Sequence, residues 1–215
     1  MSDEYRFDVK KKRPEEKYPD VRDYYKGKTL SDYAMSKSKM RIQEKIARRS
    51  LDLLELKEGS LILDAGCGPG FSSILLREMG YKTVALDLIP GFLNFYDLKE
   101  INPIVADMTL IPLRDGIFDG IISISALQWV FRDLNDNSMR NSMINLVKSF
   151  ERVLKPAGKI VIQFYPKNDS LMTEIGKIFK NYTNLNGNFL IDNPDSPKKR
   201  RIFLLLEKKI PLSSQ

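Results

Sequence analysis

A short apolar run that ends in a glycine-rich turn constrains the fold of this chain more than any other feature. Residues 60–65 read as a buried strand, and the turn Gly66-Cys67-Gly68-Pro69-Gly70 follows directly, before the helical pattern of residues 71–79. Glycines let the backbone turn sharply and approach a ligand closely. A glycine loop between a strand and a helix is the setting of a nucleotide-type binding turn, so the sequence predicts an α/β fold with a ligand at this turn.

Strands and helices alternate along most of the chain. Strands are predicted at 60–65, 82–86, 103–106, 118–123, 159–164, 188–191 and 201–207, and helices at 71–79, 91–99, 138–154 and 170–182. Strands separated by helical patterns indicate a mostly parallel sheet that helices cover on both faces. The last two strands have no helix between them and predict a hairpin. We therefore expect an α/β, Rossmann-like, seven-stranded and mostly parallel sheet with one antiparallel terminal strand.

The N-terminal part of the chain has a different composition. Residues 1–28 hold many charges and few aliphatic side chains, and the charged run 10–17 cannot offset the entropy of ordering by itself. Between residues 30 and 56, apolar side chains recur at helical spacing. We divide the chain into a flexible basic arm (1–28), a helical segment (29–57) and a main domain (58–210).

The 215 residues include no histidine and one cysteine. This composition excludes Ser/His/Asp and Cys/His nucleophilic mechanisms, an imidazole general base and a Cys/His zinc site, so no metal is expected. A single cysteine forms no internal disulfide, which fits a reducing compartment. The chain has no apolar run of about eighteen residues and no apolar stretch like that of a signal peptide. We expect a cytoplasmic protein that does not span a membrane.

The net charge of +7 is distributed unevenly along the chain. Residues 1–49 and 155–215 each carry a net charge of +6, whereas residues 50–154 carry −5. A positive surface attracts polyanions through Coulomb steering and counterion release, so the two ends favour a nucleic-acid partner. Lysine-rich ends that only keep the protein soluble are the open alternative.

Acidic residues end three successive predicted strands: Asp64, Asp87 and Asp107. Ligands of open parallel sheets bind at this edge. Asp87 can accept hydrogen bonds from both hydroxyls of a ribose, Asp107 can accept from an adenine amine beside Met108, and Asp64 can receive a ligand ammonium. The loop itself lacks the G-x-G-x-x-G of NAD enzymes and the lysine of a P-loop. Any one of these acids could instead cap a turn or a helix.

These residues, together with Leu154-Lys155-Pro156-Ala157-Gly158-Lys159, resemble the class I S-adenosylmethionine-dependent methyltransferases over about residues 58–165. The resemblance implies S-adenosyl-L-methionine as the cofactor. It places Asp64 and Gly66 at the methionine moiety, Asp87 at the ribose, and Asp107 and Met108 at the adenine. The same pocket is expected to include Cys67, Gly68, Leu88 and Ser123, with Cys67 as a small buried filler.

Three further phrases narrow the resemblance: I-S-I-S-A-L-Q-W at 122–129, Q-F-Y-P-K-N-D at 163–169, and the basic tail 192–201. Over about residues 40–207, the chain resembles the small-subunit (18S-type) ribosomal RNA guanine-N7 methyltransferase family. The resemblance implies methylation of a guanine N7 in small-subunit rRNA or a pre-ribosome. It also implies a small zinc-ribbon activator subunit that adds to the third-strand edge, where the apolar segment 101–105 lies. The equal alternative is that no subunit adds to this edge and Pro103 alone shields it.

The predicted substrate side follows the fourth and fifth strands. We assign Trp129 and Tyr165 to base stacking, and Gln128 and Asn168 to contacts with the base edge. Core packing is the alternative for Trp129. The residues assigned to RNA phosphates are Lys167, Lys198, Lys199, Arg200 and Arg201. Tyr24 and Tyr25 of the arm and Tyr33 of the helical segment could add contacts to the cofactor.

Two other functions stay open at this point. One is a small-molecule or carrier-protein O-methyltransferase, because such enzymes also show A-L-Q-W or similar phrases after the fourth strand. The other is a ribosome assembly factor that binds the cofactor without turnover. The eukaryotic family members also carry a longer basic C-terminal extension than this chain. The missing histidine is consistent with guanine-N7 methylation, because guanine N7 carries a lone pair and no proton that a base must remove.

Overall fold

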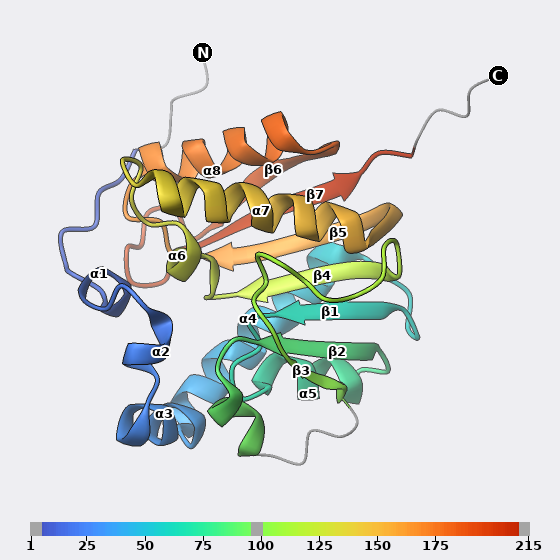
Figure 1. The fold of residues 1–215 in the computed structure, drawn as a ribbon, viewed down its shortest axis with the longest axis horizontal. Helices are drawn as coiled ribbons and strands as arrows, with labels where there is room; N and C mark the ends of the chain where they lie inside the picture. The colour runs from blue at the N-terminus through green and yellow to red at the C-terminus, as the bar shows by residue number, and fades with distance from the viewer. Residues whose placement is uncertain (1–5, 96–100, 211–215) are drawn as a thin grey trace.

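The computed structural model describes residues 6–95 and 101–210, which are built around one seven-stranded sheet (Figure 1). The strands lie in the order β3-β2-β1-β4-β5-β7-β6. All neighbouring pairs are parallel except those of β7, which is antiparallel to β5 and β6. The bounds are β1 (Leu61–Ala65), β2 (Lys82–Asp87), β3 (Pro103–Val105), β4 (Phe118–Ile124), β5 (Leu154–Phe164), β6 (Leu185–Asp192) and β7 (Arg201–Lys208). The predicted fold class, including the terminal hairpin, is confirmed.

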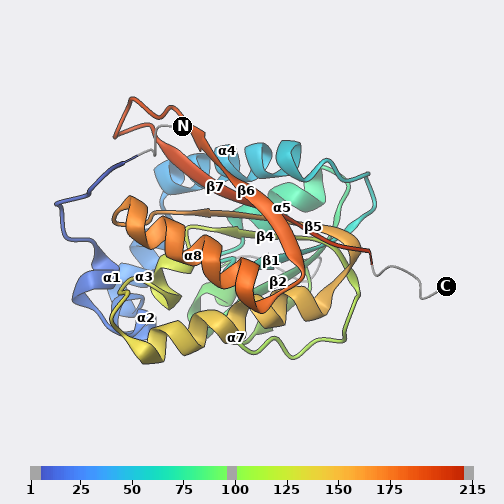
Figure 2. The same cartoon turned by 90° about the horizontal axis from the view of Figure 1, so that it is seen from above.

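Helices cover both faces of the sheet, as the view in Figure 2 shows. One face carries α4 (Lys37–Leu54) and α5 (Phe71–Glu78), and the opposite face carries α7 (Asn137–Val153) and α8 (Asp169–Tyr182). The central strands alternate between the two layers: Ile62 packs with the α4–α5 side, and Leu63 with the α7–α8 side. Burial on both faces explains why the strands read as continuous apolar runs in the sequence.

The N-terminal residues form short helices beside the carboxyl ends of the parallel strands (Figure 1). These are α1 (Pro14–Lys17), α2 (Val21–Tyr24) and α3 (Gly27–Ala34). The charge pattern predicts a flexible arm here, whereas the structure shows residues 6–28 in contact with the sheet domain. The backbone N–H of Val9 donates to the Lys167 carbonyl at 2.9 Å, so tertiary contacts hold a segment that cannot order by itself. The division into arm, helical segment and main domain stays a prediction.

Other element boundaries also differ from the prediction. The helical pattern at 30–56 is two helices, because Ser36 caps α4 by accepting a hydrogen bond from the Lys39 N–H at 3.3 Å. The helix predicted at 91–99 begins as the 3-10 helix η1 (Pro90–Asn94), and residues 96–100 lie outside the described part of the chain. A short helix, α6 (Leu127–Val130), was not predicted. None of the helices in the described ranges combines the length and apolarity that a membrane crossing requires.

Candidate active site

A cavity of about 550 Å³ lies at the carboxyl ends of β1, β2 and β4, between the glycine loop and the N-terminal helices. The loop needs its glycines, because Gly66, Gly68 and Gly70 have φ angles of 80°, 55° and 86°. A Cβ on Gly66 would lie 2.5 Å from the Cβ of Ala126. The missing side chain at Gly66 therefore lets β1 and the start of α6 approach each other closely.

Asp64 is fully buried at the end of β1, beneath the loop. Its Oδ2 accepts hydrogen bonds from the hydroxyls of Ser72 and Ser73, both at 2.5 Å. Its Oδ1 is buried without a hydrogen-bond partner in the part of the chain that the structure describes. Burial raises the pKa of the Asp64 carboxyl to about 6, against the opposing effect of the two serines. Asp64 thus carries an unused acceptor, although it does not itself line the cavity.

Asp87 fixes the glycine loop to the end of β2. Its Oδ2 accepts a hydrogen bond from the Gly68 N–H at 2.7 Å, and its Oδ1 accepts one from the Ile89 N–H at 2.8 Å. The side chain is 8% exposed and lines the cavity, and burial raises its pKa. A carboxylate has about four lone-pair sites, so both oxygens retain capacity for ligand hydroxyls.

The predicted adenine side is formed by Asp107 and Met108, which line the cavity with Leu88. Asp107 is exposed, and its Oδ1 accepts a hydrogen bond from the Thr109 N–H at 2.8 Å. This hydrogen bond forms an Asx turn, so Asp107 also has the turn-capping role that was the alternative interpretation of each acid. Its Oδ2 makes no hydrogen bond within the described residues and is open to a ligand amine.

Cys67 and Ser123 occupy different positions. The Cys67 thiol is buried and lines the cavity, and burial raises its pKa well above the usual value, which fits a filler and not a nucleophile. Ser123 does not line the cavity. Its hydroxyl donates to the Ala65 carbonyl at 2.8 Å and so ties β4 to β1 behind the loop.

Aromatic side chains from α3, α5, η1 and α6, together with Tyr25 at the end of α2, form the outer wall of the cavity. The Tyr25 ring lies 5.2 Å from that of Tyr33, 5.0 Å from Phe92 and 5.8 Å from Trp129. The Tyr33 ring stacks at 6.3 Å on Phe71. Burial raises the pKa of Tyr33 to about 12, so its hydroxyl stays protonated at neutral pH. The arm tyrosines and the predicted Trp129 therefore meet in one wall.

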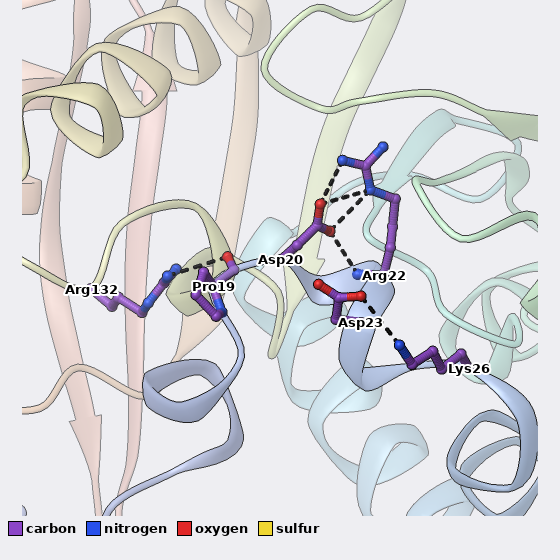
Figure 3. Close-up of polar contacts among 6 residues, drawn as sticks. All are labelled: Pro19, Asp20, Arg22, Asp23, Lys26 and Arg132. Carbon is purple, nitrogen blue, oxygen red and sulfur yellow. Dashed lines mark hydrogen bonds and ion pairs between the residues drawn. The ribbon is translucent and has the colours of Figure 1, made fainter.

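Polar contacts fasten the arm across this wall (Figure 3). Arg132 reaches from the end of α6 to the arm, and its Nη2 donates to the Pro19 carbonyl at 3.2 Å. Its Nη1 donates to the Trp129 carbonyl at 3.2 Å. On the arm itself, Asp20 caps α2 by accepting the Arg22 N–H at 2.8 Å and pairs with the Arg22 guanidinium. Arg22 and Arg132 both line the cavity, so these contacts place two cations at its mouth.

Three residues predicted to contact the base lie outside this cavity. Gln128 is buried, and its Nε2 donates to the Ser125 carbonyl at 2.8 Å. Asn168 caps α8, with its Oδ1 accepting the Leu171 N–H at 2.9 Å. Tyr165 lines a separate hollow. Of the four residues assigned to the base, the structure brings only Trp129 to the cavity.

The residues predicted to bind RNA phosphates also divide. Lys198, Arg200 and Arg201 line the separate hollow that contains Tyr165. Lys167 instead pairs with Glu16 at 3.1 Å, and Lys199 lies outside the hollow.

Ser125 is a cavity residue that sequence reasoning did not find. It follows β4 with a φ of 58°, and its hydroxyl donates to Gln163 Oε1 at 3.0 Å and accepts from Gln43 Nε2 at 3.4 Å. A left-handed conformation at a residue other than glycine is costly and often marks functional sites. The sequence holds no signal for it, because serine is common in strands and turns alike.

The acceptors around the cavity fit S-adenosylmethionine. Asp64 Oδ1 is an orphaned buried acceptor beneath the loop, so its charge favours a cationic group in the cavity although Asp64 does not line it. Asp87 suits a ribose diol, and Asp107 with Met108 suits an adenine ring. A Cβ on Gly66 would collide with Ala126 and press on Met108, so the glycine keeps the loop close to two residues that line the cavity. No cluster of three or more histidine, cysteine, aspartate or glutamate side chains suited to a metal occurs within residues 6–95 and 101–210.

Comparisons with known proteins identify methyltransferase relatives of this chain. The family described as "Methyltransferase domain" matches residues 63–162. The chain is 36% identical over 204 residues to the 18S rRNA (guanine(1575)-N(7))-methyltransferase of Saccharomyces cerevisiae, covering 93% of this chain and 74% of that protein. It is 30% identical over 189 residues to the 18S rRNA (guanine-N(7))-methyltransferase bud23 of Schizosaccharomyces pombe, covering 86% and 70%.

The fold is also shared with a solved structure from Haloferax volcanii, a methyltransferase in complex with the Trm112 methyltransferase activator. The TM-score is 0.59 at 14% identity, covering 84% of this chain and 98% of that one, which shows a common fold alone. The extent of the match to the yeast enzyme decides the family. With its glycine loop, its strand-end carboxylates and this similarity, the chain belongs to the 18S rRNA (guanine-N7)-methyltransferase family.

Proposed function

We propose that this protein transfers a methyl group from S-adenosylmethionine to N7 of a guanine in small-subunit ribosomal RNA. The observation that carries the proposal is the cavity at the strand ends, which joins the acceptors for the cofactor to the indole of Trp129. The similarity to the yeast 18S rRNA methyltransferase over 93% of this chain supports the choice of substrate.

The proposed reaction requires the protein to position the cofactor and the guanine, and it needs no general base. The bound cofactor supplies an electrophilic methyl group on its sulfonium. Guanine N7 already carries an in-plane lone pair, so no proton has to be removed, which is consistent with a chain without histidine. Asp87 binds the ribose and fixes the glycine loop, while Asp107 orients the adenine. Holding two reactants in line lowers the barrier by removing translational and rotational freedom beforehand.

Trp129 provides the surface for the target base. It lines the cavity, and its ring lies 5.6 Å from Tyr24 and 5.8 Å from Tyr25, so packing limits its motion. An aromatic face stacks on any base, and it attracts the positive charge that the guanine gains on methylation. For Gln128 and Asn168, the geometry favours positioning roles over the predicted contacts with the base edge, because Gln128 holds the Ser125 carbonyl and Asn168 caps α8.

The third-strand edge is the proposed docking site of a zinc-ribbon activator subunit. β3 is the outermost strand of the sheet beside β2 and is only three residues long. Val105 is 52% exposed and Leu110 is 78% exposed, so apolar surface accompanies an open backbone edge. Such an edge can accept an added strand. The methyltransferase of the same fold from the Haloferax volcanii complex was solved with the Trm112 methyltransferase activator. A cytoplasmic location stays a proposal.

The test combines the purified protein and its activator with labelled S-adenosylmethionine and total RNA. Nuclease digestion and mass spectrometry should then find the label in 7-methylguanosine from small-subunit rRNA. Label in an acyl carrier protein or a small molecule would instead establish the O-methyltransferase alternative. Cofactor binding without any transfer, with the activator present, would identify an assembly factor without turnover.

A further inference from the structure

Two basic segments from opposite ends of the chain meet around Tyr165. A hollow of about 710 Å³, which we call the basic groove, is lined by residues 7–11, 13, 164–166, 197–198 and 200–202. Figure 2 shows the N-terminal segment beside the loop that joins β6 and β7. The cations that line the groove are Lys10, Lys11, Arg13, Lys198, Arg200 and Arg201, and Asp8 is the one acid in the lining. Both positively charged ends of the sequence thus contribute to a single surface.

The groove is built by specific contacts and is not a loose charged tail. Asp8 forms a backbone bridge with Asn168, and the Arg13 guanidinium donates to the Tyr165 carbonyl. The guanidinium carbons of Arg13 and Arg201 lie 5.7 and 5.9 Å from the centre of the Tyr165 ring. Tyr165 therefore brings together two cations that are 188 positions apart in the chain. Its ring is engaged with them, which disfavours the predicted stacking on the target base.

Much of the positive charge in the groove is not neutralised. Lys10, Lys11 and Lys198 are exposed, and none of them pairs with a carboxylate in residues 6–95 or 101–210. Lys167, just outside the groove, is by contrast paired with Glu16 at 3.1 Å. Cations gathered without counter-charges repel each other, and a polyanion that crosses the groove relieves this repulsion and releases counterions.

The groove is linked to the cofactor cavity through the arm. Arg13 lines the groove and Pro19 lines the cavity, and the short helix α1 is nearly all that separates them. Contacts at both ends hold this connection, from Arg13 to Tyr165 and from Arg132 to Pro19. A strand whose target base enters the cavity can therefore pass its neighbouring phosphates over the groove.

We propose that the basic groove binds the phosphodiester backbone of a single-stranded RNA segment that flanks the target guanine. The proposal rests on the proposed function, since it takes the substrate to be RNA. Because two arginines already lie over the Tyr165 ring, the groove contacts phosphates and reads no base. It therefore positions the RNA strand without recognising its sequence. The arm is thereby part of the RNA-binding surface as well as the cover of the cavity.

Adjacent lysines provide a matched test. Lys11→Glu/Lys198→Glu reverses two charges inside the groove, whereas Lys12→Glu/Lys199→Glu makes the same change one position away, outside it. Binding of a short fluorescent single-stranded RNA is measured by anisotropy over a range of salt. The groove variant should bind at least tenfold more weakly. The slope of the logarithm of the binding constant against the logarithm of the salt concentration should become shallower by about 1.4. Each of the two lost phosphate contacts contributes about 0.7 to this slope. The control variant should stay within about threefold of the wild type.

Two further readouts complete the test. The affinity for S-adenosylhomocysteine should be unchanged in both variants, because none of the four lysines lines the cofactor cavity. Should charge reversal unfold the protein, Lys11→Gln/Lys198→Gln and its matched control repeat the measurement with a milder change. Equal losses in both variants, or no loss in the groove variant, would overturn the proposal. Failure of the wild type to methylate rRNA would overturn the proposed function instead, since the groove is tested by binding and not by turnover.

Discussion

The Asp87 carboxylate at the end of β2 accepts the backbone N–H of Gly68 at 2.7 Å. This hydrogen bond joins the second strand to the glycine loop that follows the first. The same side chain lines the cofactor cavity and also holds the Ile89 N–H. A single carboxylate thus shapes the loop and presents acceptors to the ligand, so loop geometry and cofactor binding should be lost together.

Asp87→Ala should weaken binding of S-adenosylhomocysteine by at least thirtyfold, by about 2 kcal/mol or more, because it removes a charged acceptor and leaves two backbone donors unpaired. Isothermal titration calorimetry measures the change. Asp52→Asn, at an exposed position on α4, is the control and should bind like the wild type. Retention of wild-type affinity in Asp87→Ala would remove Asp87 from the cofactor site.

Gly66→Ala should be far more damaging than Gly59→Ala. The two glycines have nearly equal φ angles, 80° and 83°, so both substitutions carry the left-handed cost of about 1–2 kcal/mol. Only at Gly66 does the new Cβ meet another atom, 2.5 Å from Ala126 Cβ, whereas nothing lies within 4 Å at Gly59. Urea unfolding should show an additional loss of about 1–3 kcal/mol for Gly66→Ala, with loss of cofactor binding. Equal effects of the two variants would contradict the tight fit at Gly66.

Much of the fold followed from the sequence, because parallel strands buried on both faces are continuous apolar runs. Ile62 and Leu63 point to opposite helical layers, yet both are fully buried. The rule that ligands bind at strand ends also predicted that Asp87 and Asp107 lie near each other, and both line one cavity. Asp64 follows the same rule in the chain but lies beneath the loop, because Ser72 and Ser73 hold it there.

The arm could not be placed from its own residues. Its order depends on contacts that a local pattern does not encode, such as Tyr25 against Trp129 and the Pro19 carbonyl on Arg132. The same limit applies to Tyr165, for which the phrase Q-F-Y-P-K-N-D predicted stacking on a base. The arginines that occupy its ring come from both ends of the chain, and only the tertiary fold brings them together.

The stability of the ligand-free protein should depend on pH through Asp64. Burial raises the pKa of this carboxyl from 3.8 to about 6, so folding favours the protonated acid. Its stabilising effect is complete below about pH 4 and is lost as the pH rises through 6. Asp64→Asn mimics the neutral acid. Relative to the wild type, the free energy of unfolding of this variant should rise by about 2 kcal/mol between pH 4 and pH 7.

Urea unfolding of both proteins across this pH range measures the difference. Asp87 also has a raised pKa, and its charge helps to raise the pKa of Asp64, but it is present in both proteins, so its own titration largely cancels in the comparison. A difference in stability that stays constant from pH 4 to pH 7 would show that the Asp64 carboxyl does not titrate in this range.

Trp129→Ala should lower the rate of rRNA methylation at subsaturating RNA by about ten- to a hundredfold, because stacking of a base on an aromatic ring contributes about 1–3 kcal/mol. Trp129→Phe keeps an aromatic face and should recover most of the rate. Tyr182→Ala removes an aromatic ring at the end of α8, outside the cavity, and is the control. If Trp129→Ala methylates like the wild type, Trp129 only packs against the arm tyrosines.

The position of the transferred methyl group tests the proposed function most directly. The wild-type protein and Asp87→Ala, each with the activator, are incubated with small-subunit rRNA and S-adenosylmethionine labelled on the methyl group, and the digested RNA is examined by mass spectrometry. Label is expected in 7-methylguanosine at a single rRNA position with the wild type, and much less label at that position with Asp87→Ala at a subsaturating cofactor concentration. Label on another atom or another molecule, or no label with the wild type, would contradict the proposed function.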